Sequence, residues 1–500
     1  MNELYLLSAV ILLLVVLVAA LLDRWSVPVI LVALGAGIVF GSDVLGLWHF
    51  SDVVLSNQVA NIALVFILFQ GGFGTRREDF RSVALAAGGL ATWGVVLTAA
   101  ATFVVLWRVL RWPLQEALLL GVIISSTDAA ATFSILRRQQ LPRRLSSTLE
   151  IESAANDPMA ILLTVAAVEA FTAGTGQWHM VALSFAWKSA AGICIGWLLA
   201  HGALWLFNRL GPRDRGHYYV MLLGVVLLVY SLAEEARASG MLAVFVAGYV
   251  TGNRPFVHKQ GVANFSSALS TIAHIGMFVL LGLLVAPRQW AGLWPRGILL
   301  FLVLTLVARP VAVWLGTLGM RLGVKNRLFI SWAGLRGAVP IVLATYPLAA
   351  GLAVGQDVFN LVFFAVLMSV LIQGSSLGVV AKWLKLSTAS RPQSLYNLEL
   401  ITMAKSDLDL VVVDLPGPQG ARGPRVRDLP LPAGSVIVLI TRGSEVVIPK
   451  GNTHLEGWDQ VTVLAHVSDE AAVRAALLDG EYIQPEAATD EDCRGNGQPG

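Results

Sequence analysis

The sequence predicts an all-α polytopic membrane bundle, followed by a small α+β domain in the cytoplasm. Of the 500 residues, 56% are hydrophobic and only 13% are charged, which is unusually apolar for a soluble chain. Apolar runs of roughly 20 residues recur up to about position 384, and each is long enough to cross a bilayer. After about residue 390 the apolar runs become short and are separated by Gly and Pro.

The apolar runs give the number of helices, and the charges between them give the orientation. We expect about 13 transmembrane helices, at residues 4–22, 27–41, 58–74, 82–107, 114–136, 148–172, 180–208, 217–234, 240–253, 263–286, 295–320, 328–350 and 357–383. Loops on one side carry 19 Lys and Arg residues and loops on the other side carry five. Because basic loops face the cytoplasm, the N-terminus is predicted outside and the C-terminus inside, in the cell (inner) membrane. The first helix lacks a signal-peptide pattern and is expected to be retained.

Changes in composition along the chain divide it into four parts. We expect a transmembrane domain at 1–385, a linker at 386–394, a soluble domain at 395–484 and a disordered tail at 485–500. Strands are predicted at 408–415, 435–441 and 460–466, and a helix at 469–478. Cys194 lies in an apolar span and Cys493 in the tail, so a disulfide between them is not expected. No basic stripe indicates a nucleic-acid partner; the lipid bilayer is the expected environment.

The fifth span contains a carboxylate among small and hydroxylated residues. Ser125, Ser126, Thr127, Asp128 and Thr132 lie close together near its middle. Ser, Thr and Asp side chains compete for backbone hydrogen bonds, so this stretch is a weak helix. If it is unwound, its carbonyls become free to coordinate a dehydrated cation. The alternative is a polar contact between helices.

The sixth span carries Glu152 and Asp157, the latter followed by a proline. Ser153 and Asp157 are four residues apart and share a helical face, while Pro158 removes a backbone donor. Burial in a bundle makes the charged form of Asp157 costly, which suits a side chain that takes up and releases a proton. The alternative is a carboxylate paired permanently with a neighbour.

The twelfth span contains Gly334-Leu335-Arg336-Gly337, followed by Pro340, a pattern that predicts an interrupted helix. Arg336 requires a carboxylate partner, and Glu152 is our first choice. Elsewhere, Arg309 is interpreted as a snorkelling helix-end charge or a minor ion pair. His274 is interpreted as a satisfied core histidine rather than a proton relay. Interrupted helices in the fifth and twelfth spans are typical of transporters with inverted repeats.

Three motifs in this order resemble the NhaP-type branch of the monovalent cation:proton antiporter superfamily, over residues 1–385. The motifs are Thr127-Asp128, Glu152-Ser153 with Asn156-Asp157, and Gly334-Leu335-Arg336-Gly337. The resemblance implies a homodimer in which a core domain carries the ion past a scaffold. An Asn rather than an Asp at position 156 is associated, in this superfamily, with electroneutral exchange.

The resemblance also implies a role for each matching residue. Asp157 would be the carboxylate that binds either the proton or the cation. Asp128, Ser153 and the Thr127 backbone would be further ligands. Asn156 would hold the unwound fifth span, and Glu152 would pair with Arg336. Two positions depart from the pattern. Gln70 stands where many relatives have an acidic residue, which puts a peripheral ligand in question, and Ala129 stands where relatives often have Pro.

The soluble part resembles the C-terminal half of the potassium-conductance-regulator module, or TrkA-C. The matching residues are Leu429-Pro430, 436–440, Arg442-Gly443, 448–453 and 457–459, and no G-x-G-x-x-G signature precedes them. The resemblance implies regulation by a small ligand of nucleotide type, and it favours K⁺ as the transported ion.

The sequence therefore predicts a secondary antiporter that exchanges K⁺, or alternatively Na⁺, for H⁺ by alternating access. No cofactor is expected beyond the transported ions. A cation channel would use a similar polar pathway without needing a titrating carboxylate. An enzyme is not expected, because no H-E-x-x-H or comparable constellation is found in the spans. A sensor that transports nothing would show no ion flux after purification.

Overall fold

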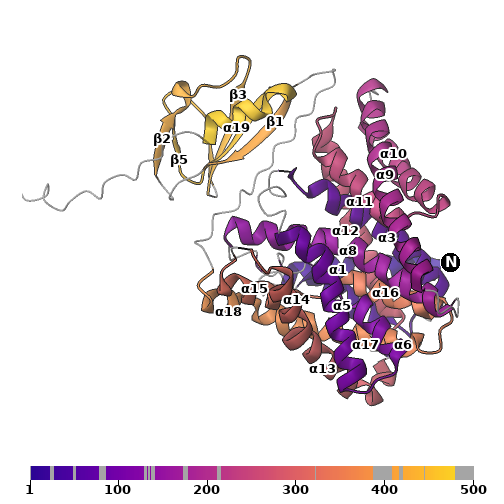
Figure 1. The fold of residues 1–500 in the computed structure, drawn as a ribbon. Helices are drawn as coiled ribbons and strands as arrows, with labels where there is room; N and C mark the ends of the chain where they lie inside the picture. Colours follow the sequence, from indigo (N-terminus) through magenta and orange to yellow (C-terminus); the bar gives the residue numbers. More distant parts are fainter. Residues whose placement is uncertain are drawn as a thin grey trace, which may run out of the picture. The chain divides into compact units, whose positions relative to one another are not determined.

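The computed structural model describes residues 2–22, 28–48, 52–77, 86–128, 132, 136, 141–172, 178–210, 215–285, 287–320, 322–386, 408–415, 421–443 and 445–478. It divides the chain into two compact units, residues 1–389 and 390–500. The first unit is a bundle of helices (Figure 1). Its α-helices are α1 (Asn2–Leu22), α2 (Val29–Phe40), α3 (Val53–Gly74), α5 (Val95–Val104), α6 (Leu114–Ile123), α8 (Arg143–Thr172), α9 (Trp178–Leu210), α10 (Arg215–Glu235), α11 (Gly240–Gly252), α12 (Lys259–Leu283), α13 (Trp294–Val303), α14 (Arg309–Gly316), α15 (Val324–Ala333), α16 (Ala338–Ala349), α17 (Gly355–Met368) and α18 (Ser375–Trp383).

Four π-helical turns continue α-helices of the bundle without a break. They are η2 (Leu90–Gly94), η3 (Val105–Val109), η5 (Leu304–Ala308) and η6 (Ser369–Gly374). In an α-helix such a turn inserts one extra residue, and π-turns are frequent at functional sites. The turns join short helices into spans, such as 86–109, 294–316 and 355–383, that are long enough to cross a membrane.

The described residues contain nine helices long and apolar enough to cross a membrane, or ten if α15 and α16 count as one bent span. The shorter apolar helices α2, α6 and α11 lie where three further spans are predicted. The first unit is therefore a mostly helical membrane bundle. The full count of 13 spans remains a prediction.

Two places in the bundle have non-helical backbone between helical stretches. α6 ends at Ile123, and residues 124–128 continue outside a helix. α15 ends at Ala333 and α16 begins at Ala338, with a bend of 50° between them. Pro158, in contrast, lies inside a continuous α8. Two stretches within the bundle therefore leave backbone donors and acceptors that need partners other than their own helix.

The second unit contains two small antiparallel sheets and one packed helix. Its elements are β1 (Leu408–Asp414), β2 (Arg422–Arg425), β3 (Val436–Arg442), β4 (Glu445–Val447), β5 (His454–Glu456), β6 (Gln460–His466) and α19 (Glu470–Leu478). Four strands pair in the antiparallel order β1-β6-β3-β4, and β2 pairs with β5. The predictions of strands at 408–415, 435–441 and 460–466 and of the C-terminal helix are confirmed. The predicted linker from residue 387 onward and the predicted tail lie outside the described residues.

Candidate functional site

The two non-helical segments of the bundle are bonded to each other. The Asp128 N–H donates to the Leu335 carbonyl at 2.8 Å, and the Thr132 hydroxyl donates to the Ala333 carbonyl at 3.1 Å. The buried Arg336 donates from Nη1 to the carbonyls of Ser125, at 2.9 Å, and Ser126, at 2.5 Å. Each segment thus supplies hydrogen-bond partners that the other lacks. The sequence predicts free carbonyls in the fifth span, and the Arg336 guanidinium is bonded to two of them.

Side chains of η6 complete the hydrogen bonds at the interruption between α15 and α16. Gln373 Nε2 donates to the Trp332 carbonyl at 3.1 Å, and the Arg336 N–H donates to Ser369 Oγ at 3.2 Å. Ser369 Oγ in turn donates to Gln373 Oε1 at 2.5 Å. Unpaired backbone groups in a low-dielectric interior are costly, so this network stabilises the interrupted backbone.

α8 holds the non-helical segment after α6 from the other side. Asn156 Nδ2 donates to Thr127 Oγ1 at 2.7 Å, and its Oδ1 lies 3.4 Å from the Thr127 N–H. The Ser153 hydroxyl donates to the Thr127 carbonyl at 2.8 Å. Thr127 is therefore fixed through its side chain and both backbone groups. The role of Asn156 in holding the fifth span remains a prediction.

Asp157 lies on α8, one turn after Ser153, and is partly buried. Its Oδ1 is fully enclosed and has no hydrogen-bond partner among the described residues. Asp128 is close enough to act on Asp157 electrostatically, and the buried Ser126 hydroxyl lies beside it. The Asp128 carboxylate lies directly against Gly337, where any Cβ would overlap it. The carboxylate of Asp128, from the segment after α6, is thus within electrostatic reach of Asp157 on α8.

Gln70 and His274 occupy neighbouring helices. Gln70 is on α3, and its buried Oε1 has no hydrogen-bond partner in the described part of the chain. His274, on α12, has Nδ1 2.9 Å from the Ser270 carbonyl and is electrostatically linked to Asp128. No hydrogen bond between described residues joins Gln70 to Asp128 or Asp157, so its role as a peripheral ligand remains a prediction.

The predicted pairing of Glu152 with Arg336 is wrong. Glu152 Oε1 lies 2.6 Å from Arg309 Nη2, and both side chains are almost fully enclosed, with exposed fractions of 1% and 2%. Arg336 is directed instead to the carbonyls of Ser125 and Ser126. Sequence spacing does not tell which of the two helices that carry Arg309 and Arg336 faces Glu152.

Of the two interpretations of Arg309, the snorkelling helix-end charge is wrong, and the structure shows an ion pair, with Glu152. Its guanidinium lies against Gly334, where a Cβ would be 2.5 Å from Nε. The two glycines of the Gly334–Gly337 motif therefore have separate steric functions. Gly334 leaves room for Arg309, and Gly337 leaves room for Asp128. The motif indicated an interrupted helix but not these contacts.

The fold and this site define a polytopic membrane protein with a polar centre. The two non-helical segments and the carboxylates of Asp128 and Asp157 form this centre. The described residues contain no group of three or more His, Cys, Asp or Glu that could hold a metal ion. The available donors are carboxylate, hydroxyl and carbonyl oxygens, which suit hard cations and protons. Such intramembrane carboxylates are typical of proton and ion pathways.

Two known protein families match separate parts of the chain. Residues 9–383 match the family described as "Sodium/hydrogen exchanger, transmembrane". Residues 411–478 match the family described as "TrkA-C domain". The chain belongs to the sodium/hydrogen exchanger family and carries a TrkA-C domain after its transmembrane part.

Several relatives resemble the chain over most of its length. It is 36% identical over 473 residues to the K(+)/H(+) antiporter NhaP2 of Shewanella oneidensis, covering 93% of this chain and 81% of that protein. It is 33% identical over 484 residues to the K(+)/H(+) antiporter NhaP of Alkalimonas amylolytica, covering 96% and 84%. The solved structure of the sodium proton antiporter MjNhaP1 from Methanocaldococcus jannaschii at pH 8 superposes with a TM-score of 0.68 at 24% identity, covering 76% of this chain and 99% of that one. This last likeness concerns the fold alone.

Proposed function

We propose that this protein is a secondary antiporter that exchanges K⁺ for H⁺ across the cell membrane by alternating access. The observation that carries the proposal is the enclosed Oδ1 of Asp157, which has no hydrogen-bond partner among the described residues and lies beside a second carboxylate, Asp128. An enclosed carboxylate needs a counter-charge or a proton. A proton and a monovalent cation are alternative ways to supply it.

Competition between the two ions gives obligatory exchange. A proton and a cation cannot both neutralise Asp157, and moving the bare carboxylate through a low-dielectric barrier is costly. The loaded forms can therefore move, while the empty anion cannot. Asp128, Ser153 and the Thr127 backbone are the proposed further ligands, Gln70 is a proposed peripheral one, and Asn156 holds Thr127 in place.

Finer features are part of the same proposal. We infer 13 transmembrane helices with inverted repeats and interrupted fifth and twelfth spans. The N-terminus would lie outside and the C-terminus in the cytoplasm, and the protein would be a homodimer. Residues 1–385 would form the transporter, 386–394 a linker, 395–484 a regulatory domain that binds a small nucleotide-type ligand, and 485–500 a tail. The Asn at position 156 favours electroneutral exchange.

Na⁺ is the second candidate ion, because the family that matches residues 9–383 is the sodium/hydrogen exchanger family. The two relatives named above, which match more than 90% of this chain, are K(+)/H(+) antiporters, which favours K⁺. Everted vesicles with a pH-sensitive dye, given K⁺, Na⁺ or Li⁺ in turn, decide between them. We expect the largest proton movement with K⁺.

The role of Asp157 is tested by Asp157→Asn in the same vesicle assay. The amide binds neither a proton nor a cation as the carboxylate does, so we expect exchange to fall by about a hundredfold or more. Asp357→Asn is the matched control, because it makes the same chemical change at an exposed position at the start of α17. Exchange retained by Asp157→Asn would refute the proposed mechanism.

A further inference from the structure

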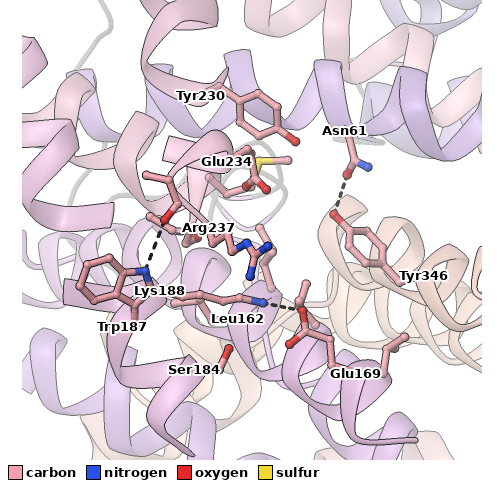
Figure 2. A pocket seen from close by; sticks show the side chains of 17 residues that line it. Asn61, Leu162, Glu169, Ser184, Trp187, Lys188, Tyr230, Glu234, Arg237 and Tyr346 are labelled. Atoms are coloured by element: carbon pink, nitrogen blue, oxygen red, sulfur yellow. Dashed lines mark hydrogen bonds and ion pairs between the residues drawn. The ribbon is translucent and has the colours of Figure 1, made fainter. Parts of the chain in front are cut away.

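A cavity of about 830 Å³ lies beside the Asp157 helix and is not part of the site described above. Its walls come from α3, α8, α9, α10, α16 and the beginning of α11 (Figure 2). Ile161 of α8 lines it, one helical turn beyond Asp157. At the other end of the same wall, Glu169 is twelve residues from Asp157, or about 18 Å along the helix axis.

Charged side chains gather in this cavity. Lys188 Nζ of α9 lies 2.5 Å from Glu169 Oε1 of α8, and the two side chains have exposed fractions of 19% and 50%. Glu234, at the end of α10, is electrostatically linked to both of them and accepts a hydrogen bond from the Gly240 N–H at 2.8 Å. Figure 2 shows Arg237 directed into the same space, between Glu234 and the α8 wall.

Lys188 is held on the side of the cavity opposite α8. Its own carbonyl accepts a hydrogen bond from the Ser239 N–H at 3.1 Å. The neighbouring Trp187 donates from Nε1 to the Ala236 carbonyl at 3.3 Å. These bonds fix α9 to the turn between α10 and α11, so the ammonium reaches across the cavity to the helix that carries Asp157.

We propose that this cavity is a second monovalent-cation site on the route to Asp157, with the Lys188 ammonium as a tethered occupant that an entering cation displaces. An ammonium and K⁺ carry the same charge, and both bind carboxylate oxygens. Glu169 and Glu234 supply those oxygens, and the Lys188 stem is flexible enough to withdraw. This inference rests on the proposed function, because it assigns the cavity to the path of the transported ion.

The charge balance of the cavity explains why the occupant matters. With Lys188 in place, Glu169, Glu234, Lys188 and Arg237 are balanced two against two. When the ammonium withdraws from Glu169, that carboxylate loses its counter-charge and attracts another cation. Cation affinity at this site therefore depends on how readily Lys188 leaves. A shorter or neutral side chain at position 188 would leave the carboxylate open.

The first test measures K⁺ binding to the cavity in a protein whose Asp128 and Asp157 carboxylates, the inner site, have been replaced by amides. In full-length Asp128→Asn/Asp157→Asn protein, K⁺ titrated against choline should raise the thermal unfolding midpoint in a saturable way. Adding Lys188→Gln should lower the half-saturating K⁺ concentration by about tenfold, because the competitor is gone. Lys188→Met should do the same. Adding Glu169→Gln/Glu234→Gln to the Lys188→Gln protein should abolish the K⁺ effect, while Glu235→Gln, one residue from Glu234 and outside the cavity lining, should change nothing.

The second test separates this inference from the proposed function. Exchange is measured in vesicles with the inner site intact, and K⁺ is supplied from each side in turn. Lys188→Gln should lower KM for K⁺ severalfold from one side only, with the Glu235→Gln control unchanged. One outcome is that the wild-type chain exchanges K⁺ for H⁺ while Lys188→Gln shows the wild-type KM on both sides and no added stabilisation by K⁺. That result would refute the second site and leave the proposed antiporter function intact. If the wild-type chain shows no exchange, the proposed function itself fails.

Discussion

At the scale of single residues, the ion pair between Glu152 and Arg309 is the most enclosed charge interaction among the described side chains. Removing one member leaves the other charge buried without compensation. We expect Arg309→Met to destabilise the protein by roughly 3–5 kcal/mol. Glu152→Gln should cost a similar amount. The double variant should cost less than the two single variants added together, as measured by thermal or denaturant unfolding in detergent.

A charge swap distinguishes this pair from the predicted one. Glu152→Arg combined with Arg309→Glu should recover part of the folded protein lost in the single variants. Glu152→Arg combined with Arg336→Glu should recover none, because Arg336 bonds to the carbonyls of Ser125 and Ser126 rather than to Glu152. Equal recovery in both swaps would contradict the assignment.

Gly337 gives a second prediction at this scale. A Cβ at this position would overlap the Asp128 carboxylate, so Gly337→Ala must displace one wall of the site. We expect exchange to fall by about ten- to a hundredfold, because small displacements of reacting groups have large effects. Gly276→Ala is the control, since no atom lies within 4 Å of a Cβ built there. It should leave exchange unchanged in the vesicle assay.

The sequence predicted which residues meet at this site better than it predicted their pairings. The small, hydroxylated stretch around Asp128 predicted non-helical backbone, and the spacing of Ser153 and Asp157 placed them on one face. The partner of Glu152 was missed because Arg309 and Arg336 are both intramembrane cations, and only packing selects between them. The charged cavity had no motif to reveal it, since Glu169, Lys188 and Glu234 are separated in the sequence and belong to three helices.

At the scale of elements, the interruption between α15 and α16 depends on side chains from η6. Gln373 supplies the hydrogen bond that the Trp332 carbonyl no longer receives from its own helix. We expect Gln373→Leu to destabilise the protein by about 1–3 kcal/mol, the cost of an unsatisfied buried carbonyl. It should also slow exchange, because Ser369 loses its acceptor. Unfolding midpoint and initial exchange rate are the two measurements.

The control for that variant is Gln356→Leu, at an exposed position in the first turn of α17. This change removes the same amide but no hydrogen bond to an interrupted helix. An effect of Gln373→Leu no larger than that of Gln356→Leu would contradict the supporting role of η6. The Gly and Pro residues of the twelfth span predicted the interruption itself, but the π-helical turn that supports it carries no such signal.

At the scale of the whole molecule, each unit has its own hydrophobic core. The large core cluster draws its buried residues from positions 11–370, and the core of the second unit draws on positions 411–477. Within the second unit, Arg442 donates to both carboxylate oxygens of the buried Asp459 and to Glu456. The hydrogen bonds to Asp459 raise the pKa of Arg442 above its ordinary value. Because this pKa lies above an already high ordinary value, Arg442 stays charged across the neutral range, and on the alkaline side its contribution to stability is lost only as the pH rises through that raised pKa.

Because all the proposed ion ligands lie in the first unit, the transport chemistry should survive without the second. A chain truncated after residue 389 should insert in the membrane and unfold cooperatively in detergent. It should exchange K⁺ for H⁺ with a KM within about twofold of that of the full chain, because distant, independent parts contribute separately. Its rate should no longer respond to nucleotide-type ligands that change the rate of the full chain. The Asp157→Asn change in the truncated chain should abolish exchange as it does in the full one. A truncated chain that folds but does not exchange would show instead that the TrkA-C domain is part of the transport cycle rather than its regulator.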